Sequence, residues 1–335
     1  MPVRASGPQQ RTALWAVLIA LASALFFTST YVLNRAIADG GGHWAWTASL
    51  RYFLTLPLLL PLMRWQGGSA PVHAALRAHP GAWLLCSGIG FVLFYVCLAF
   101  AASSGPAWLV AGSFQLTVIA GMLLAPLLYR DARARLPRAA IAVAVVVLAG
   151  IALMQLGHFD GALDRAAWFA LACVVVAAVA YPLGNRMLLL HLERSGEQLN
   201  ATQRVYGMTL VCQPLWLPVA ALAWWQAGWP HAAQVALAAG VALGAGVIAT
   251  VLFFQATGMV RDNPTALGAA EAMQGSEILF ASAFGMLLLG EALPQGWAIV
   301  GVLLVVAGIV GFGVLAGRSA GDTRATRALR SDRGA

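Results

Sequence analysis

Ten long apolar segments recur along the chain, and they constrain its fold more than any other feature. Each is about 20 residues long, enough for a helix to span the roughly 30 Å hydrocarbon core of a bilayer. The 335 residues are 61% hydrophobic and only 10% charged, and no soluble domain fits between the segments. The longest connection, 66–81, reads as a Gly/Pro/His loop. The predicted fold is an all-α polytopic membrane protein with ten transmembrane helices. The spans are residues 13–35, 44–65, 82–102, 107–128, 137–156, 166–188, 203–225, 233–256, 266–289 and 296–316.

The distribution of arginines predicts how these spans are oriented. All 20 basic residues are arginines, and 17 of them fall on one side if the N-terminus is cytoplasmic. The exceptions are Arg35, Arg51 and Arg165. We therefore expect a multi-pass membrane protein with a cytoplasmic N-terminus (1–12) and a cytoplasmic basic tail (318–335). Because the arginines are scattered between apolar runs, they favour the lipid bilayer as partner and exclude a nucleic-acid-binding face.

An internal repeat divides the spans into two sets of five. The first span ends in YVLNR at 31–35, and the sixth ends in YPLGNR at 181–186. The second span begins RYFLTLPLLLP at Arg51, and the seventh begins RVYGMTLVCQPLWLP at Arg204. Matches in the same order at a near-constant offset indicate duplication.

Gln115 and Gln274 give the third match, because each follows a proline by nine or ten residues in the fourth and ninth spans. The two predicted repeats are 13–156 and 157–317. Since each has an odd number of spans, they lie in the membrane with opposite orientation, as in many secondary transporters.

Several of these stretches resemble the ten-helix form of the drug/metabolite transporter superfamily. They are FFTSTYVLNRAIA in the first span, the arginine that opens the second, the short Gly/Pro link between the third and fourth, and the closing LLLGEALPQGWAIVGVLLVVAGIVGF. The stretch AEAMQGSEILFA is similar to the branch of multidrug-resistance efflux transporters. The resemblance implies a small-molecule exporter of the bacterial inner membrane with a central cavity lined by both halves. Small four-helix exporters of this superfamily use a glutamate in their first helix, and the first span here has none.

The ninth span carries the residues with the strongest case for a transport role. A carboxylate near the middle of a membrane helix costs about 2.5–3.5 kcal/mol on insertion scales, so Glu277 and Glu271 need a reason to be there. We expect Glu277 to be a counter-ion for substrate or a proton carrier, whereas Glu271 could equally be an interhelical lock. Gln274 lies one turn from each. With Gln115, it could orient a substrate by hydrogen bonds or join neighbouring helices.

Tyr31 and Tyr181 are the aromatic candidates for a cavity because the repeat pairs them, and Thr28 lies deeper in the first span. A further set of polar residues lies near span ends and is predicted to serve gating or structure. For its arginines, the simpler interpretation is a side chain that reaches the lipid headgroups, although Arg51 or Arg204 could pair with a glutamate. The set is Asn34, Arg35, Asn185, Arg186, Arg51 and Arg204.

The predicted function is secondary export of a small organic molecule, such as a drug or amino-acid-like metabolite, with protons as a further partner through Glu277. The alternative is an uncoupled facilitator or exchanger. An enzyme is disfavoured, because the six histidines lie in loops or at helix ends, no aspartate lies within a span, and no ATP-binding signature occurs. The four cysteines lack metal-binding spacing, so no cofactor or metal is predicted. One chain holds both repeats, which allows a monomer or a homodimer.

Overall fold

The structure is a computed structural model that describes residues 8–104, 107–135, 137–155, 164–289 and 295–331. Within these ranges the chain forms helices and no strand. Seven helical stretches are long and apolar enough to cross a membrane. They are Pro8–Asp39, Pro80–Ser104, Leu109–Leu128, Arg165–Ser195, Ala201–Ala227, Ala232–Met259 and Trp297–Arg318. The predicted class, an all-α polytopic membrane protein, is therefore confirmed, and the count of ten spans stays a prediction.

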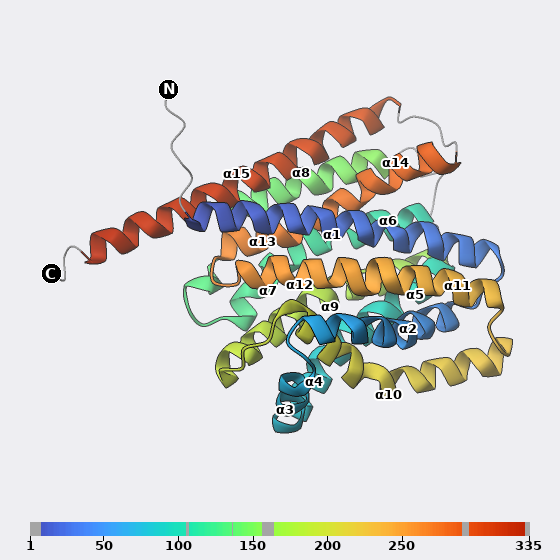
Figure 1. The fold of residues 1–335 in the computed structure, drawn as a ribbon. Helices are drawn as coiled ribbons and strands as arrows, with labels where there is room; N and C mark the ends of the chain where they lie inside the picture. Colours follow the sequence, from blue (N-terminus) through green and yellow to red (C-terminus); the bar gives the residue numbers. More distant parts are fainter. Residues whose placement is uncertain (1–7, 105–106, 136, 156–163, 290–294, 332–335) are drawn as a thin grey trace.

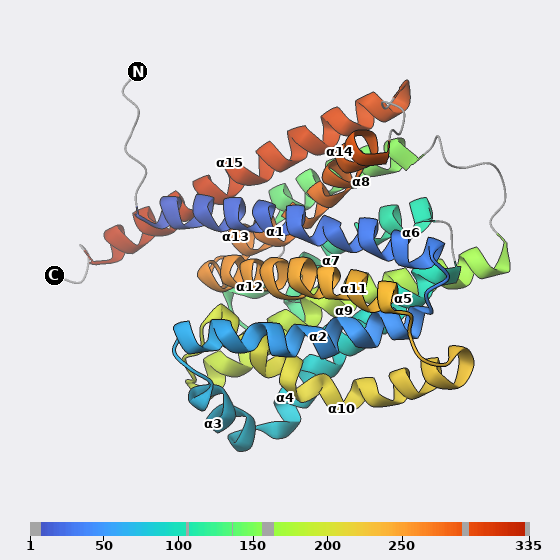
Figure 2. The same ribbon diagram turned by 45° about the vertical axis from the view of Figure 1, so that its right-hand side comes forward.

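Most of the helices run side by side along one common direction (Figures 1 and 2). The start of α1 and the end of α15 lie at the same end of the molecule (Figure 1). The helices that cover the predicted first repeat are α1 (Pro8–Asp39), α2 (Trp44–Trp65), α4 (Pro80–Ser87), α5 (Phe94–Ser104), α6 (Ala107–Phe114), α7 (Thr117–Leu128) and α8 (Arg138–Gln155). Those of the second are α9 (Arg165–Ser195), α10 (Ala201–Ala227), α11 (Ala232–Val241), α12 (Thr250–Met259), α13 (Pro264–Ala272), α14 (Glu277–Leu289) and α15 (Trp297–Ser331).

Four of the predicted spans depart from one continuous α-helix. The third and eighth spans contain π-helical stretches, η1 (Gly88–Leu93) and η4 (Ala242–Ala249), in glycine-containing sequence. The fourth is interrupted between α6 and α7, and the ninth by the 3₁₀ turn η5 (Met273–Ser276). Such interruptions release backbone groups from the regular helix pattern, and they are frequent at functional sites.

Two segments that lie outside the predicted spans are helical. The predicted loop 66–81 contains α3 (Ala70–Ala78), which has proline in its first turn and buries Val72 and Ala75. The prediction of a loop relied on glycine and proline and did not take account of these two buried side chains. The predicted basic tail continues the last helix, because the α15 backbone stays helical to Ser331.

The buried apolar residues form two large clusters. One gathers around α2, α4, α5, α9, α10 and α12 and is rich in aromatic rings. The other lies between α1, α7, α8, α13 and α15 and consists mainly of alanine and branched aliphatic side chains. The helix pairs α8–α15, α2–α10, α5–α9 and α1–α12 make the extensive contacts. Polar side chains of the candidate site come from helices of both clusters.

Candidate functional site

Glu277 lies where the ninth span is interrupted. The helix α13 ends at Ala272, the 3₁₀ turn η5 follows, and Glu277 begins α14. A carboxylate in the first turn of a helix interacts favourably with the helix dipole. The side chain is only 2% exposed and is therefore enclosed within the protein.

Two side chains from the first half of the chain approach this carboxylate. The Tyr31 hydroxyl, on α1, donates a hydrogen bond to Glu277. Arg51, on α2, lies close enough to Glu277 for their charges to interact. The sequence predicted functional roles for Tyr31 and Glu277, and for Arg51 it left open a headgroup contact or a pairing with a glutamate. That headgroup contact is wrong, because Arg51 is 3% exposed.

Arg51 is held by aromatic rings. Its guanidinium lies 4.1 Å from the ring centre of Tyr95 and 5.4 Å from that of Tyr52. The Asn34 amide donates a hydrogen bond of 3.2 Å to the Tyr95 hydroxyl. A desolvated cation over an aromatic face gains about 2 kcal/mol, which offsets part of the cost of its burial. Asn34 therefore positions the ring that holds Arg51.

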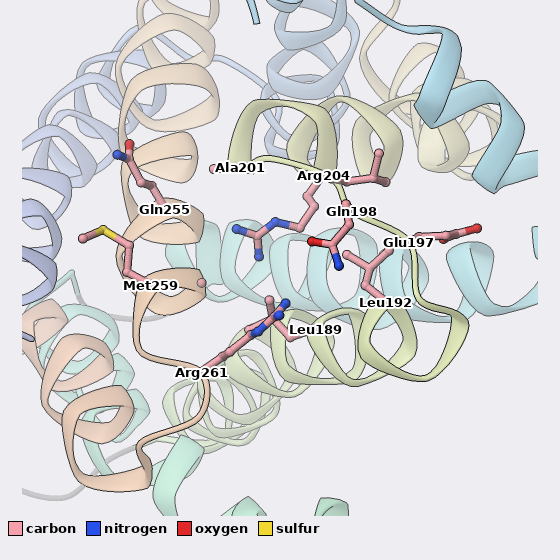
Figure 3. A pocket seen from close by; sticks show the side chains of 11 residues that line it. Leu189, Leu192, Glu197, Gln198, Ala201, Arg204, Gln255, Met259 and Arg261 are labelled. Carbon is pink, nitrogen blue, oxygen red and sulfur yellow. The ribbon is translucent and has the colours of Figure 1, made fainter. Parts of the chain in front are cut away.

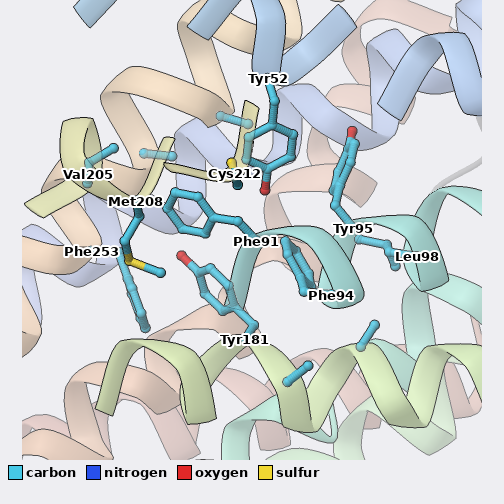
Figure 4. Packing of buried hydrophobic residues seen from close by; sticks show 14 of the residues in the cluster. Tyr52, Phe91, Phe94, Tyr95, Leu98, Tyr181, Val205, Met208, Cys212 and Phe253 are labelled. Atoms are coloured by element: carbon cyan, nitrogen blue, oxygen red, sulfur yellow. The ribbon is translucent and has the colours of Figure 1, made fainter. Parts of the chain in front are cut away.

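Further aromatic side chains surround Tyr181 (Figure 4). Its ring centre lies 4.8 Å from that of Phe94 and 5.1 Å from that of Phe253. Within the described part of the chain the buried Tyr181 hydroxyl has no hydrogen-bond partner. A polar group of this kind inside an aromatic cluster is costly unless something else binds it, so Tyr181 remains a candidate contact for a ligand.

Glu271 has a different environment from Glu277. It accepts two hydrogen bonds from Arg186 on α9, with N···O distances of 2.8 and 2.7 Å, and both side chains are almost fully buried. The pair faces Gly121 of α7, where an added Cβ atom would lie 2.0 Å from a Glu271 oxygen. This ion pair between α9 and α13 favours the interhelical lock, one of the two alternatives that the sequence left open. Arg186 does not reach the headgroups, which corrects that expectation.

Among the remaining predicted residues, Thr28 is bonded within its own helix, and Asn185 and Arg204 are bonded to α12. Asn185 donates to Thr257 of α12 at 3.1 Å, which joins two helices. Thr28 donates to the carbonyl oxygen of Ala24 in its own helix at 3.0 Å. Arg204 is buried within the protein at the start of α10 instead of extending outward into the lipid. The side chain of Arg35 lies outside the described part of the structure.

The two predicted glutamines are both buried, Gln115 at 1% and Gln274 at 3% exposure. One amide atom of each, Gln115 Oε1 and Gln274 Nε2, has no hydrogen-bond partner among the described residues. Both therefore have capacity left to bind another molecule. Their joint contact with a substrate stays a prediction.

Sequence reasoning did not assign a role to Tyr52 or Tyr95, which hold Arg51, or to Tyr129, which hydrogen bonds Arg186. Tyr52 directly follows Arg51, but helical neighbours point in different directions, so adjacency gave no signal. Tyr95 and Tyr129 lie far from their partners along the chain. In the part of the chain that is described, no group of three His, Cys, Asp or Glu side chains is arranged to hold a metal ion.

Comparisons with known proteins cover nearly the whole chain. The family EmrE, described as "Putative multidrug resistance efflux transporter", matches residues 14–318. The "Uncharacterized protein YjlA" of Bacillus subtilis (strain 168) is 41% identical over 304 residues, covering 88% of this chain and 93% of that protein. A 42.1 kDa protein of Shouchella clausii is 37% identical over 268 residues, 78% of this chain and 70% of that one. One crystal structure shares the fold with a TM-score of 0.66 and 19% identity, covering 90% of this chain and 98% of the other.

Proposed function

Because the chain belongs to the EmrE family of multidrug efflux transporters, we propose that it is a secondary exporter of a small organic molecule across the bacterial inner membrane, with Glu277 as the group that meets substrate or protons. The observation that carries this role is the enclosure of Glu277, with the Tyr31 hydroxyl bonded to it and the charge of Arg51 nearby. These three side chains come from the ninth, first and second predicted spans. A carboxylate enclosed among helices of both halves is where substrate and coupling ions bind in transporters built from inverted repeats.

Features shared by the two halves support the inverted repeat. The third and eighth spans each carry a π-helical stretch. The fourth and ninth are each interrupted beside one of the paired glutamines, Gln115 and Gln274. The contacts correspond as well, since α9 packs on the third span as α1 packs on the eighth. π-helical stretches are rare, so their occurrence at corresponding places in both halves indicates a common origin or a common use.

The side chains around Glu277 favour one class of substrate. A molecule that entered beside Glu277 would meet a carboxylate, the Arg51 guanidinium and the rings of Tyr95 and Tyr181. Opposite charges near aromatic rings suit an amino-acid-like molecule with an aromatic side chain better than a simple lipophilic cation, because Arg51 would repel a second cation. We therefore favour an aromatic amino-acid-like metabolite as cargo.

Transport requires the surroundings of Glu277 to open to each side of the membrane in turn. Glu277, Arg51 and Tyr181 are at most 4% exposed, so the described conformation is occluded at this point. The π-helical stretches in the third and eighth spans, which border the aromatic cluster, are suitable places for the helices to bend. Small shifts there would expose the carboxylate from one end or the other.

The test is transport by the purified protein in proteoliposomes, with phenylalanine and tetraphenylphosphonium as the two probes. If protons bind Glu277, an imposed pH gradient drives uptake of the accepted probe by the wild type. The variant Glu277→Gln cannot exchange a proton, so it loses the response to the gradient. The matched control Glu193→Gln changes an exposed carboxylate near the end of α9 and keeps the wild-type response.

An equal response of wild type and Glu277→Gln to the gradient would exclude proton coupling through this residue. The alternative function, an uncoupled facilitator or exchanger, predicts downhill transport that no pH gradient changes. Its support is Arg51, a fixed positive charge near Glu277 that could bind an anionic group of the substrate without proton exchange. Absence of transport of either probe in every condition would refute the proposed substrate classes.

A further inference from the structure

A pocket of about 220 Å³ lies at the end of the molecule where α9 and α12 end and α10 begins (Figure 3). It is lined by residues of these helices, of the α9–α10 loop and of the α12–α13 turn. Glu277 and its partners are not part of it. The volume far exceeds the ~10–15 Å³ that one water needs and is below the ~300 Å³ at which pockets take drug-sized ligands. The pocket suits a small group.

Arg204 extends into the centre of this pocket (Figure 3). It is 5% exposed, and its Nη2 donates a 2.5 Å hydrogen bond to the carbonyl oxygen of Phe254. Its Nε and Nη1 atoms have no hydrogen-bond partner among the described residues. A buried guanidinium with three unused N–H donors is costly, because the Phe254 ring, whose centre lies 5.6 Å from the guanidinium, replaces only part of its lost hydration.

The other polar side chains around the pocket add positive charge and donors. Arg261 lies near Arg204, and the amides of Gln198 and Gln255 also line the wall. Glu197 supplies the single carboxylate of the lining, and its Oε2 atom has no partner among the described residues. Two arginines and one glutamate leave a net positive charge, which attracts an anion.

We propose that this pocket binds a phosphate group, either free phosphate or the phosphate of an anionic lipid headgroup. The planar fork of an arginine matches phosphate oxygens bidentately, and a tetrahedral group can accept from Arg204 and Arg261 together. The pocket lies at the ends of membrane-spanning helices, at the depth where lipid headgroups occur. A bound phosphate would join the α9–α10 loop to the α12–α13 turn.

The test is thermal unfolding of the full-length protein in a neutral detergent. One arm adds sodium phosphate against sodium chloride at equal ionic strength. The other adds short-chain phosphatidylglycerol against a phosphate-free neutral lipid of the same chain length. A ligand that binds the folded state raises Tm in a saturable way. A rise with phosphate alone identifies a free anion as the ligand, and a rise with phosphatidylglycerol alone identifies a headgroup.

Arg261→Gln is expected to weaken the apparent affinity about tenfold, because it removes charged hydrogen bonds. Arg261 is half-buried at a turn, so this variant tests the pocket even if Arg204→Gln fails to fold. Gly258→Ala is the second variant, because the added Cβ would lie 2.6 Å from Arg204 Nη2 and displace the guanidinium. Arg77→Gln, which changes an exposed arginine on α3, is the control and keeps the response.

Three results would overturn the proposal. They are no rise in Tm with either probe, the same rise in Arg261→Gln and Arg77→Gln, and a Glu197→Gln variant as destabilised as Arg204→Gln. The last would make Glu197 the counter-ion of Arg204. Tighter phosphate binding by Glu197→Gln supports the site, because a repulsive charge has been removed.

Discussion

The two glutamates of the ninth span have the same residue type and are both buried, but their partners differ. Both Glu271 and Glu277 are enclosed, but Glu271 has a bidentate arginine partner and Glu277 has a tyrosine. Removing one member of a buried ion pair leaves the other charge uncompensated, at a cost of about 3–5 kcal/mol. We therefore predict that Glu271→Gln lowers the free energy of unfolding by that amount, measured by thermal or denaturant unfolding in detergent.

A double replacement separates the charge from the shape of the site. Arg186→Met with Glu271→Leu removes both charges and is expected to recover most of the stability lost by the single change. Gly121→Ala should also destabilise, because its Cβ would collide with the Glu271 carboxylate, whereas Gly313→Ala on α15 meets no atom within 4 Å and serves as control. A single Glu271→Gln variant as stable as wild type would contradict the lock.

The sequence predicted several residues of the site but not the contacts that they make. Depth and cost singled out Glu277, Glu271 and Gln274, and the repeat singled out Tyr31, without any knowledge of contacts. The partners could not be predicted, because Arg186 and Glu271 are 85 residues apart and are brought together by the packing of α7 against both α9 and α13. Arg51 and Arg186 were expected at headgroups because they lie near predicted span ends, but aromatic rings compensate Arg51 and a carboxylate compensates Arg186 inside the protein.

At the scale of the element, the start of α10 depends on a capping box. The Asn200 side chain accepts from the Gln203 backbone N–H at 2.9 Å, and the Gln203 side chain accepts from the Asn200 backbone N–H at 3.0 Å. Asn200 also donates to the Gln66 carbonyl oxygen at 2.6 Å. We predict that Asn200→Ala destabilises the protein by about 1 kcal/mol and speeds hydrogen exchange of amides in the first turn of α10.

Ser69→Ala provides the matched control for this cap. Ser69 precedes α3 in the N-cap position, but its side chain makes no capping hydrogen bond. Its replacement should leave both Tm and the exchange rates of α3 unchanged. If Asn200→Ala and Ser69→Ala behave alike, the capping box contributes nothing measurable to stability.

Apolar length predicted where helices occur, because every proposed span contains helix within the described ranges. It could not predict their interruptions. The 3₁₀ turn Met273–Ser276 and the π-helical stretches lie in runs that stay hydrophobic throughout, and hydropathy does not register a change from one hydrogen-bonding pattern to another. The helix α3 was not predicted, because the glycine and proline around it are typical of loops and its apolar face is short.

For the whole molecule, the arrangement of ends constrains the topology. The start of α1 and the α12–α13 turn lie at one end, and the α10–α11 connection lies at the other (Figures 1 and 2). If the termini are cytoplasmic, as the arginine distribution predicts, the α12–α13 turn is cytoplasmic as well. The α10–α11 connection is then on the outside of the membrane.

Single cysteines at these two connections test that orientation. His231 and Asp262 are both exposed, and His231 makes no capping hydrogen bond with α11, so either position tolerates replacement. In a background with the four native cysteines replaced, we expect His231→Cys to react with a membrane-impermeant maleimide on intact cells. Asp262→Cys should react only after the membrane is opened. The reverse pattern would mean that the arginine distribution misassigns the cytoplasmic side, and labelling of both from outside would break the alternation on which ten spans depend.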